Sequence, residues 1–284
     1  MCLIGSTLFV DKSSDRVRGW LYSYFRDLQI VSKYAWGAGV LAWMYRQLGR
    51  SSRAGSKGFS GCLTLLQAWI YEYFPSLRIN RAAPQTVAQG DPLARRWEGP
   101  VHGGGPSEVP RRLDHYRRLL DGFTADHVDW LPFGAHPGRA VPRSLYRGVI
   151  RIYDVTEAYD PSRTLRQFGY RQVIPDPPIR PSRVSRPAVG TYRVVFGADL
   201  DQLWRSRGQL INLDAYSTPF DDTGSVDPEY LKWYTLRTHP CIVPPRDGEQ
   251  QEVALLTYEM VSFYVFPLLV NFIYNILYYC GMIY

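Results

Sequence analysis

The chain has 284 residues and a mass of 32.6 kDa, with 45% hydrophobic and 21% charged residues. This composition excludes disorder along the whole chain, and the length allows one large domain whose core needs no disulfide or metal. The formal net charge is +7, and only four of the 33 basic residues are lysines, so Arg dominates. An Arg-rich balance is compatible with nucleic acid, acidic protein or an anionic membrane surface, and it selects none of them.

Apolar residues recur at helical spacing over residues 15–29, 33–50 and 61–74, which predicts three helices in the first part of the chain. The third segment is apolar on both faces and ends before Pro75, so we expect it to be the buried central helix. The tryptophans on the second and third helices lie among small and aliphatic residues, and we interpret them as core residues rather than as an aromatic cage. They are Trp36, Trp43 and Trp69.

Regular spacing is lost over residues 77–110, which are rich in Pro, Gly and Arg and are predicted to form a long loop. A short helix is predicted over residues 111–122. Residues 128–133 and 145–155 are predicted as extended segments or short strands.

Residues 161–168 begin with Pro at a first-turn position and are predicted to form a short helix. Residues 175–187 are predicted to be exposed and polyproline-like. The last predicted helices cover residues 199–207 and 228–236. Together these segments predict a mainly α fold, an irregular helical domain with a few short β-strands and long Pro-rich loops. A strand-rich arrangement of residues 128–196 is the alternative.

Several long segments resemble the plant mobile domain family, in order along the chain. They are residues 5–12, 33–48, 61–75, 116–117, 128–132, 157–175, 227–234 and 238–240. The resemblance implies one domain over residues 4–243, with a helical core at 15–75, the loop at 77–110 and a second half at 111–243. It also implies structural roles for nine residues, namely Trp36, Trp43, Cys62, Trp69, Glu72, Trp130, Glu157, Phe168 and Gly169.

The family carries an aminotransferase-like label, and some of its members are fused to a phosphatase domain of the protein phosphatase 7 type. Its members that resemble MAINTENANCE OF MERISTEMS are nuclear and are implicated in meristem maintenance and transposon silencing. The resemblance therefore implies a nuclear interaction module whose partners are nuclear proteins of a silencing or developmental pathway. The alternative is a mobile-element-derived nucleic-acid-binding protein, or a truncated and inactive copy. Truncation is an expectation for two reasons: family members usually carry additional helices before the motif at 5–12, and residues after 251 do not resemble the family.

An aminotransferase needs a Lys for the pyridoxal Schiff base and a cup for the cofactor phosphate. Lys12 and Lys57 lie in predicted polar turns, and Lys232 lies on an exposed helical face. Lys33 precedes a helix without a Gly/Ser cup beside it. We therefore predict that the chain holds no pyridoxal cofactor, has no small-molecule substrate and is not an enzyme.

Metal sites are not indicated either. The four cysteines, Cys2, Cys62, Cys241 and Cys280, form no CxxC pair, which excludes a disulfide framework and indicates a reducing compartment. The spacings of His115, His127 and His136 fit no helix face, so we interpret them as loop histidines. The carboxylates that a nuclease would need are interpreted as solvated or paired with Arg. They are Asp121, Asp154, Glu157 and Asp160.

The segment 157–175 carries the binding residues that we single out. Arg163 and Arg166 are three residues apart on the predicted short helix, with Gln167 and Gln172 nearby, so both guanidiniums would share one face. This face would hold a phosphate or a nucleobase. In the alternative interpretation, Glu157 or Asp160 clamps an Arg and ties this helix to the N-terminal core.

The tail over residues 253–284 is apolar, and its last 25 residues, 260–284, contain no charge. As a helix they would extend about 37 Å, which is enough to cross a bilayer core of about 30 Å. The interpretations are a membrane anchor, which would make the chain membrane-associated rather than nuclear, a buried terminal helix, or translated non-coding sequence.

Overall fold

The computed structural model describes residues 2–10, 17–51, 60–78, 86, 88, 93–97, 115–116, 118–132, 145–179, 198–209, 211–219 and 226–236. Within them, helices predominate and the sheet has two strands, which confirms the predicted mainly α class. The α-helices are α1 (Cys2–Thr7), α2 (Leu21–Tyr24), α3 (Trp36–Ser51), α4 (Leu63–Tyr73), α6 (Ala198–Arg205) and α7 (Pro228–Thr235). The 3₁₀ helices are η1 (Val31–Lys33), η2 (Pro75–Leu77), η3 (Leu93–Trp97), η5 (Ala125–His127), η7 (Pro161–Phe168), η8 (Ser206–Gly208) and η9 (Leu213–Ala215).

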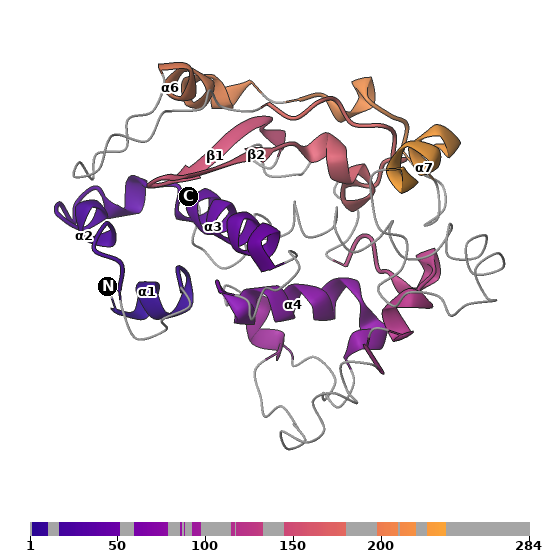
Figure 1. Cartoon of the computed structure of the whole chain (residues 1–284), viewed down its shortest axis with the longest axis horizontal. Helices are drawn as coiled ribbons and strands as arrows, with labels where there is room; N and C mark the ends of the chain where they lie inside the picture. Colours follow the sequence, from indigo (N-terminus) through magenta and orange to yellow (C-terminus); the bar gives the residue numbers. More distant parts are fainter. Residues whose placement is uncertain are drawn as a thin grey trace.

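The two strands β1 (Gly148–Ile152) and β2 (Val155–Tyr159) form an antiparallel hairpin. In the view of Figure 1 this hairpin lies between α6 and α3, and α4 lies beyond α3. Tyr153 in the hairpin turn has a φ of +50°, a conformation that a non-Gly residue adopts rarely. Its backbone N–H donates to the Tyr24 hydroxyl at 3.0 Å, and its ring stacks on Trp20 at 5.4 Å between centroids. These two contacts hold the turn against the N-terminal segment.

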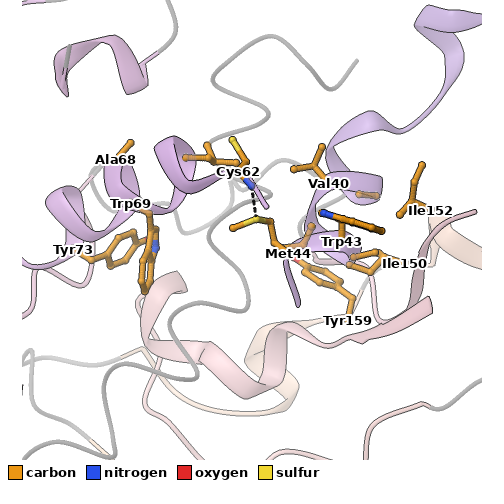
Figure 2. Close-up of a cluster of buried hydrophobic side chains, with 14 of the residues drawn as sticks. Val40, Trp43, Met44, Cys62, Ala68, Trp69, Tyr73, Ile150, Ile152 and Tyr159 are labelled. Atoms are coloured by element: carbon orange, nitrogen blue, oxygen red, sulfur yellow. Dashed lines mark hydrogen bonds between the residues drawn. The ribbon is translucent and has the colours of Figure 1, made fainter. Parts of the chain in front are cut away.

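Helix α3 is the central helix of the core. Nine of its residues are buried, because the hairpin covers one side of the helix and α4 lies on another. Figure 2 shows Trp43 of α3 beside Ile150 and Tyr159, and Met44 directed toward α4. The Met44 sulfur accepts a hydrogen bond from the Cys62 backbone N–H at 3.1 Å. A Cβ at Gly39 would lie 3.1 Å from the Ile152 side chain, so glycine here allows α3 to approach β1 closely.

The prediction that residues 61–74 form the buried central helix is wrong in its second part. The helix exists as α4, but only one of its faces is buried, and Leu63 is 53% exposed. The apolar residues on both faces of the segment 61–74 do not indicate which helix the hairpin covers. The contact between α3 and the hairpin, which is distant in sequence, makes α3 the central helix.

The predicted helix over residues 15–29 is also wrong. In the part that the structure describes, 17–29, the α-helical residues are those of α2, and turns surround them. Leu28, which the pattern placed on the inner face, is 76% exposed. Trp20 instead packs with its edge toward Phe9, 5.6 Å away, so aromatic contacts fix this segment without a continuous helix.

Most of the remaining predicted elements are confirmed, and three of the predicted segments need correction. Helices α3, α6, α7 and η7 lie where periodicity and Pro placement predict them, and the residues described between 115 and 121 are helical. The predicted strand at 145–155 begins at Gly148 and pairs with β2, whereas 128–132 is not a strand. The predicted loop at 77–110 includes η3, which brings Trp97 into the core at 7% exposure.

The main hydrophobic cluster contains residues from Phe9 to Tyr234, and a smaller cluster contains Leu165, Phe168, Tyr170 and Leu213. The domain limits of 4–243 stay a prediction, since residues 237–284 lie outside the described part. The apolar tail at 253–284 lies there too. Among the helices that the structure describes, none is both long and apolar enough to cross a membrane.

Candidate functional site

The predicted binding segment 157–175 is built mainly as an internal support. Glu157 on β2 pairs with Arg46 of α3 at 2.5 Å, and the Arg46 Nη2 also donates to the Thr156 carbonyl at 3.0 Å. These contacts tie the hairpin to α3, whereas the alternative interpretation of this segment expected such a pair to tie the short helix at 161–168 to the N-terminal core. The Arg that Glu157 holds is Arg46, which the sequence pattern did not single out.

Asp160 is 2% exposed and supports two elements. Its Oδ1 accepts from the Ser162 backbone N–H at 3.0 Å, which caps η7, and its Oδ2 accepts from the Arg147 Nε at 3.1 Å. Arg147 also pairs with Asp176 at 3.0 Å and donates to the Tyr216 hydroxyl at 3.4 Å. Burial would lower the pKa of Arg147, but the charges of Asp160, Tyr216 and Asp176 outweigh it and raise that pKa. Arg147 is therefore the centre of a network that joins β1, η7 and the segment near η9.

Arg163 and Arg166 do not share a face. Arg163 is exposed, whereas Arg166 is 3% exposed and its guanidinium carbon lies 3.7 Å from the ring centroid of Trp130. The cause is a break inside η7, where Thr164 has φ −141° and ψ 43°. A uniform helix would have placed residues three apart together, but this break separates them. The buried cation over Trp130 joins η7 to the segment that follows η5.

The two glutamines of this segment are buried as well, at 3% exposure each. The Gln172 Oε1 accepts from the Leu165 backbone N–H at 2.9 Å, and its Nε2 donates to the Ser162 carbonyl at 3.0 Å. The Gln172 side chain thus satisfies a backbone donor and a backbone acceptor of η7. Phe168 is buried in the smaller cluster, and Gly169 ends η7 in a left-handed conformation at φ +82°. Of the four predicted binding residues, the structure leaves Arg163 exposed.

The remaining residues with an implied structural role are placed in the core. Trp43 and Trp69 are 2% and 1% exposed, Cys62 is 8% exposed, and Trp36 packs at the start of α3. Burial raises the pKa of the Cys62 thiol. The Trp36 indole donates to the Val31 carbonyl at 2.8 Å, which links η1 to α3. The interpretation as core residues is confirmed for Trp43 and Trp69, whereas Trp36 is half-buried and packs against the main hydrophobic cluster.

Glu72 is a buried carboxylate on α4, at 3% exposure. It accepts from the Trp97 indole at 2.9 Å and pairs with Arg96 at 3.3 Å, so it anchors η3 to α4. Burial raises the pKa of Glu72, and the Trp97 hydrogen bond and the Arg96 and Arg78 charges oppose that rise only in part. The raised pKa means that the folded state holds the Glu72 proton more tightly than the unfolded chain does.

This shift predicts a pH dependence. The stabilisation from the protonated form is fully present below the ordinary pKa of 4.5 and is lost as pH rises through the higher pKa of the folded state. The free energy of unfolding of the wild type should therefore fall relative to that of Glu72→Gln across this window. Urea unfolding at a series of pH values measures the difference, with Glu229→Gln, at an exposed position of α7, as the control for net charge. A difference independent of pH would contradict the assignment.

The histidines and lysines in the described part are placed as follows. The His127 Nδ1 lies 2.7 Å from the Thr124 hydroxyl and accepts from the Thr124 backbone N–H at 3.0 Å, which completes a capping box around η5. His115 packs beside Tyr116, with ring centroids 5.7 Å apart. Lys33 ends η1 and Lys232 lies on α7, whereas Lys12, Lys57 and His136 lie outside the described residues. Within the described residues, no group of three His, Cys, Asp or Glu side chains could hold a metal ion.

A cleft of about 340 Å³ lies between three parts of the fold. One wall runs from the end of α2 through η1 to the start of α3, the floor is β1, and the other wall is α6 with η8. Its polar and aromatic lining residues are Tyr24, Lys33, Tyr34, Trp36, Tyr146, Arg151, Asp201, Trp204 and Arg207. The sequence pattern did not identify this site, because its residues come from three segments far apart in the chain.

The aromatic side chains of the cleft are held by contacts with one another. Tyr34 lies edge-on to Tyr24 at 5.2 Å and to Trp36 at 5.9 Å. On the opposite wall, Trp204 lies edge-on to Tyr146 at 6.1 Å and is 36% exposed. The cleft therefore presents rigid rings from both walls, and the Trp204 ring is accessible to solvent.

Three cations and one carboxylate share this cleft. The Arg207 guanidinium carbon lies 5.1 Å from the Trp204 ring centroid, and its Nη1 donates to the Trp204 carbonyl at 2.9 Å. The Arg151 Nε donates to the Tyr153 carbonyl at 3.0 Å, and partial burial lowers the pKa of Arg151 although Tyr24 and Asp201 oppose that shift. Lys33 is exposed on the wall that contains η1. With Asp201 as the one acid among the described lining residues, the lining is positively charged overall.

Comparisons with known proteins agree on one family. The family model described as plant mobile domain matches residues 1–235. The chain is 32% identical to Protein MAIN-LIKE 1 of Arabidopsis thaliana over 82% of this chain and 44% of that protein. It is 34% identical to Protein MAINTENANCE OF MERISTEMS of the same plant over 61% of this chain and 36% of that protein.

A third relative, Serine/threonine-protein phosphatase 7 long form homolog of Arabidopsis thaliana, is 32% identical over 62% of this chain but over 14% of its own length. The matches thus cover less than half of each of these relatives. No solved structure matches the chain.

Proposed function

The chain belongs to the plant mobile domain family, and on this premise we propose that it is a non-catalytic binding module that acts in the nucleus. Its proposed role is in meristem maintenance and in transposon or gene silencing, in line with the name Protein MAINTENANCE OF MERISTEMS that one relative carries. The matches cover less than half of each relative described above, so the role concerns this module rather than those whole proteins.

The chemistry of the cleft lining carries the non-catalytic part of the proposal. Its described lining residues are aromatic rings, aliphatic side chains, three cations and one carboxylate, and no His, Cys or Ser is among them. Acid–base catalysis by paired carboxylates or attack by an activated nucleophile requires a second group next to the first. The carboxylates Glu157 and Asp160, in contrast, are engaged in structural ion pairs.

The proposed partners are nuclear proteins of a silencing or developmental pathway, with neither cofactor nor small-molecule substrate. A second candidate is nucleic acid, and the excess of cations in the cleft favours it. Membrane association through residues 253–284 stays the alternative localisation.

Affinity purification of the full chain from plant nuclei, with identification of both proteins and nucleic acids, tests this proposal. We expect the wild type to retain partners and Trp204→Ala to lose them, because Trp204 is the accessible ring of the cleft. Arg205→Gln, on the same helix but outside the cleft lining, is the matched control and should retain them. A purified chain that turns over a phosphoester or an amino-group donor, and loses this activity in a folded Glu157→Gln variant, would overturn the non-catalytic proposal.

A further inference from the structure

The lining of the cleft indicates which class of ligand it could bind. It combines rings from both walls with three cations, against the single carboxylate of Asp201. Its volume of about 340 Å³ is in the range of sites that enclose one small ligand or one unit of a polymer. An anion with an aromatic part matches this combination, whereas a plain anion would leave the rings without a partner.

The rings are arranged for stacking. Trp204 is 36% exposed and carries the Arg207 guanidinium 5.1 Å from its centroid, so a ring and a cation are presented together. The edge-on contact with Tyr146 fixes the indole, which lowers the entropy lost when a flat ligand binds. Tyr34 and Trp36 present further aromatic surface from the opposite wall.

The cations are placed to meet phosphate. Arg207 is exposed beside Trp204, and Lys33 is exposed at the end of η1 on the other wall. Neither has a carboxylate partner among the described residues. Arg donates paired hydrogen bonds to phosphate oxygens, and Lys adds a mobile point charge.

We propose that this cleft binds one nucleotide unit of a single-stranded nucleic acid, with the base on Trp204 and the phosphates at Lys33 and Arg207. Single strands are required because the bases of a duplex are stacked and paired and do not reach a side-chain ring. An acidic peptide, or one phosphorylated on Ser or Thr, would use the cations but not the flat rings, so the ring content favours a nucleotide. The inference rests on the proposed binding function and deepens its second candidate, nucleic acid, because it names the ligand class of the same cleft.

Fluorescence anisotropy with the purified full chain tests the inference. The probes are labelled oligothymidine and oligouridine of about 10 nucleotides, which separate DNA from RNA, and a duplex of equal length. We expect binding of at least one single strand, weaker binding of the duplex, and a slope of log affinity against log salt of about −1.4 for two phosphate contacts. Measurements between about 50 and 200 mM NaCl give this slope.

Matched variants locate the binding. Trp204→Ala should weaken it by about five- to a hundredfold, and Trp204→Phe should restore most of it. Arg207→Gln and Lys33→Gln should each reduce the salt slope by about 0.7, whereas Arg205→Gln, with the same charge change on α6, should leave it unchanged. Circular dichroism of each variant verifies that the fold is retained.

Three results would overturn the inference on its own. The first is no binding of either single strand at about 50 mM NaCl. The second is equal weakening by Arg207→Gln and Arg205→Gln, which would show general attraction to a basic surface. The third is that Trp204→Ala loses bound proteins in the affinity purification but binds oligonucleotides as well as the wild type does. This third result would leave the proposed binding function standing, whereas cleft variants that changed neither protein nor oligonucleotide binding would remove both.

Discussion

Replacing Trp130 with Ala is expected to lower the free energy of unfolding by about 3–5 kcal/mol. Trp130 is 3% exposed, so removal of its indole leaves a large cavity in the main hydrophobic cluster. The change also removes the ring that lies 3.7 Å from the Arg166 guanidinium, and this cation is itself 3% exposed. A buried cation that loses its stacking partner adds to the cost of the cavity.

Urea unfolding of the full chain measures this loss, with two variants for comparison. Trp130→Phe keeps a ring face for Arg166 and should recover part of the stability. Trp204→Ala removes the same side chain from a position that is 36% exposed, and it should lower the free energy of unfolding by less than Trp130→Ala does. Similar losses for Trp130→Ala and Trp204→Ala would contradict the role assigned to the Trp130–Arg166 contact.

Replacing Asp160 with Ala should cost about 2–4 kcal/mol. The carboxylate is 2% exposed, caps η7 at Ser162 and pairs with Arg147. Arg147 is 21% exposed and pairs with two acids, the buried Asp160 and the half-exposed Asp176. Removal of Asp160 leaves Arg147 with the half-exposed Asp176 and without its buried partner. Loss of the cap and loss of the buried charge partner act together.

Two further variants separate these contributions in the same unfolding experiment. Asp160→Asn keeps a side chain that can cap η7 but removes the charge, so its loss should be smaller than that of Asp160→Ala. Asp227→Ala removes an exposed cap from α7, where the carboxylate accepts from the Glu229 N–H at 2.8 Å, and should cost about 1 kcal/mol. If Asp160→Ala costs no more than Asp227→Ala, the pair with Arg147 contributes nothing.

The sequence predicts those elements whose causes are local. Helices α3 and α7 follow from apolar spacing and from Pro228 at a first-turn position, and η7 follows from Pro161. The prediction for residues 15–29 fails because Trp20 and Tyr24 pack through aromatic contacts that do not require helical spacing. The place of Trp97 in the core could not be predicted, since its partner Glu72 lies 25 residues away across a Pro-rich segment.

The candidate sites show the same limit. Spacing alone places Arg163 and Arg166 together, whereas the break at Thr164 separates them and Arg166 lies over Trp130, a contact distant in sequence. The pairing of Glu157 with an Arg could be anticipated, but the choice of Arg46 depends on how the hairpin lies on α3. The cleft was missed altogether because β1 and α6 meet only in the folded chain.

Photo-cross-linking tests most directly whether the cleft, and not the segment 157–175, holds the ligand. The full chain would be irradiated with single-stranded oligonucleotides that contain 5-iodouracil, and the cross-linked peptides would be identified by mass spectrometry. The arrangement of rings predicts cross-links at Trp204 and Tyr34 that disappear when unlabelled single strand competes. Cross-links confined to residues 157–175, or the absence of cross-links in the two cleft walls, would contradict it.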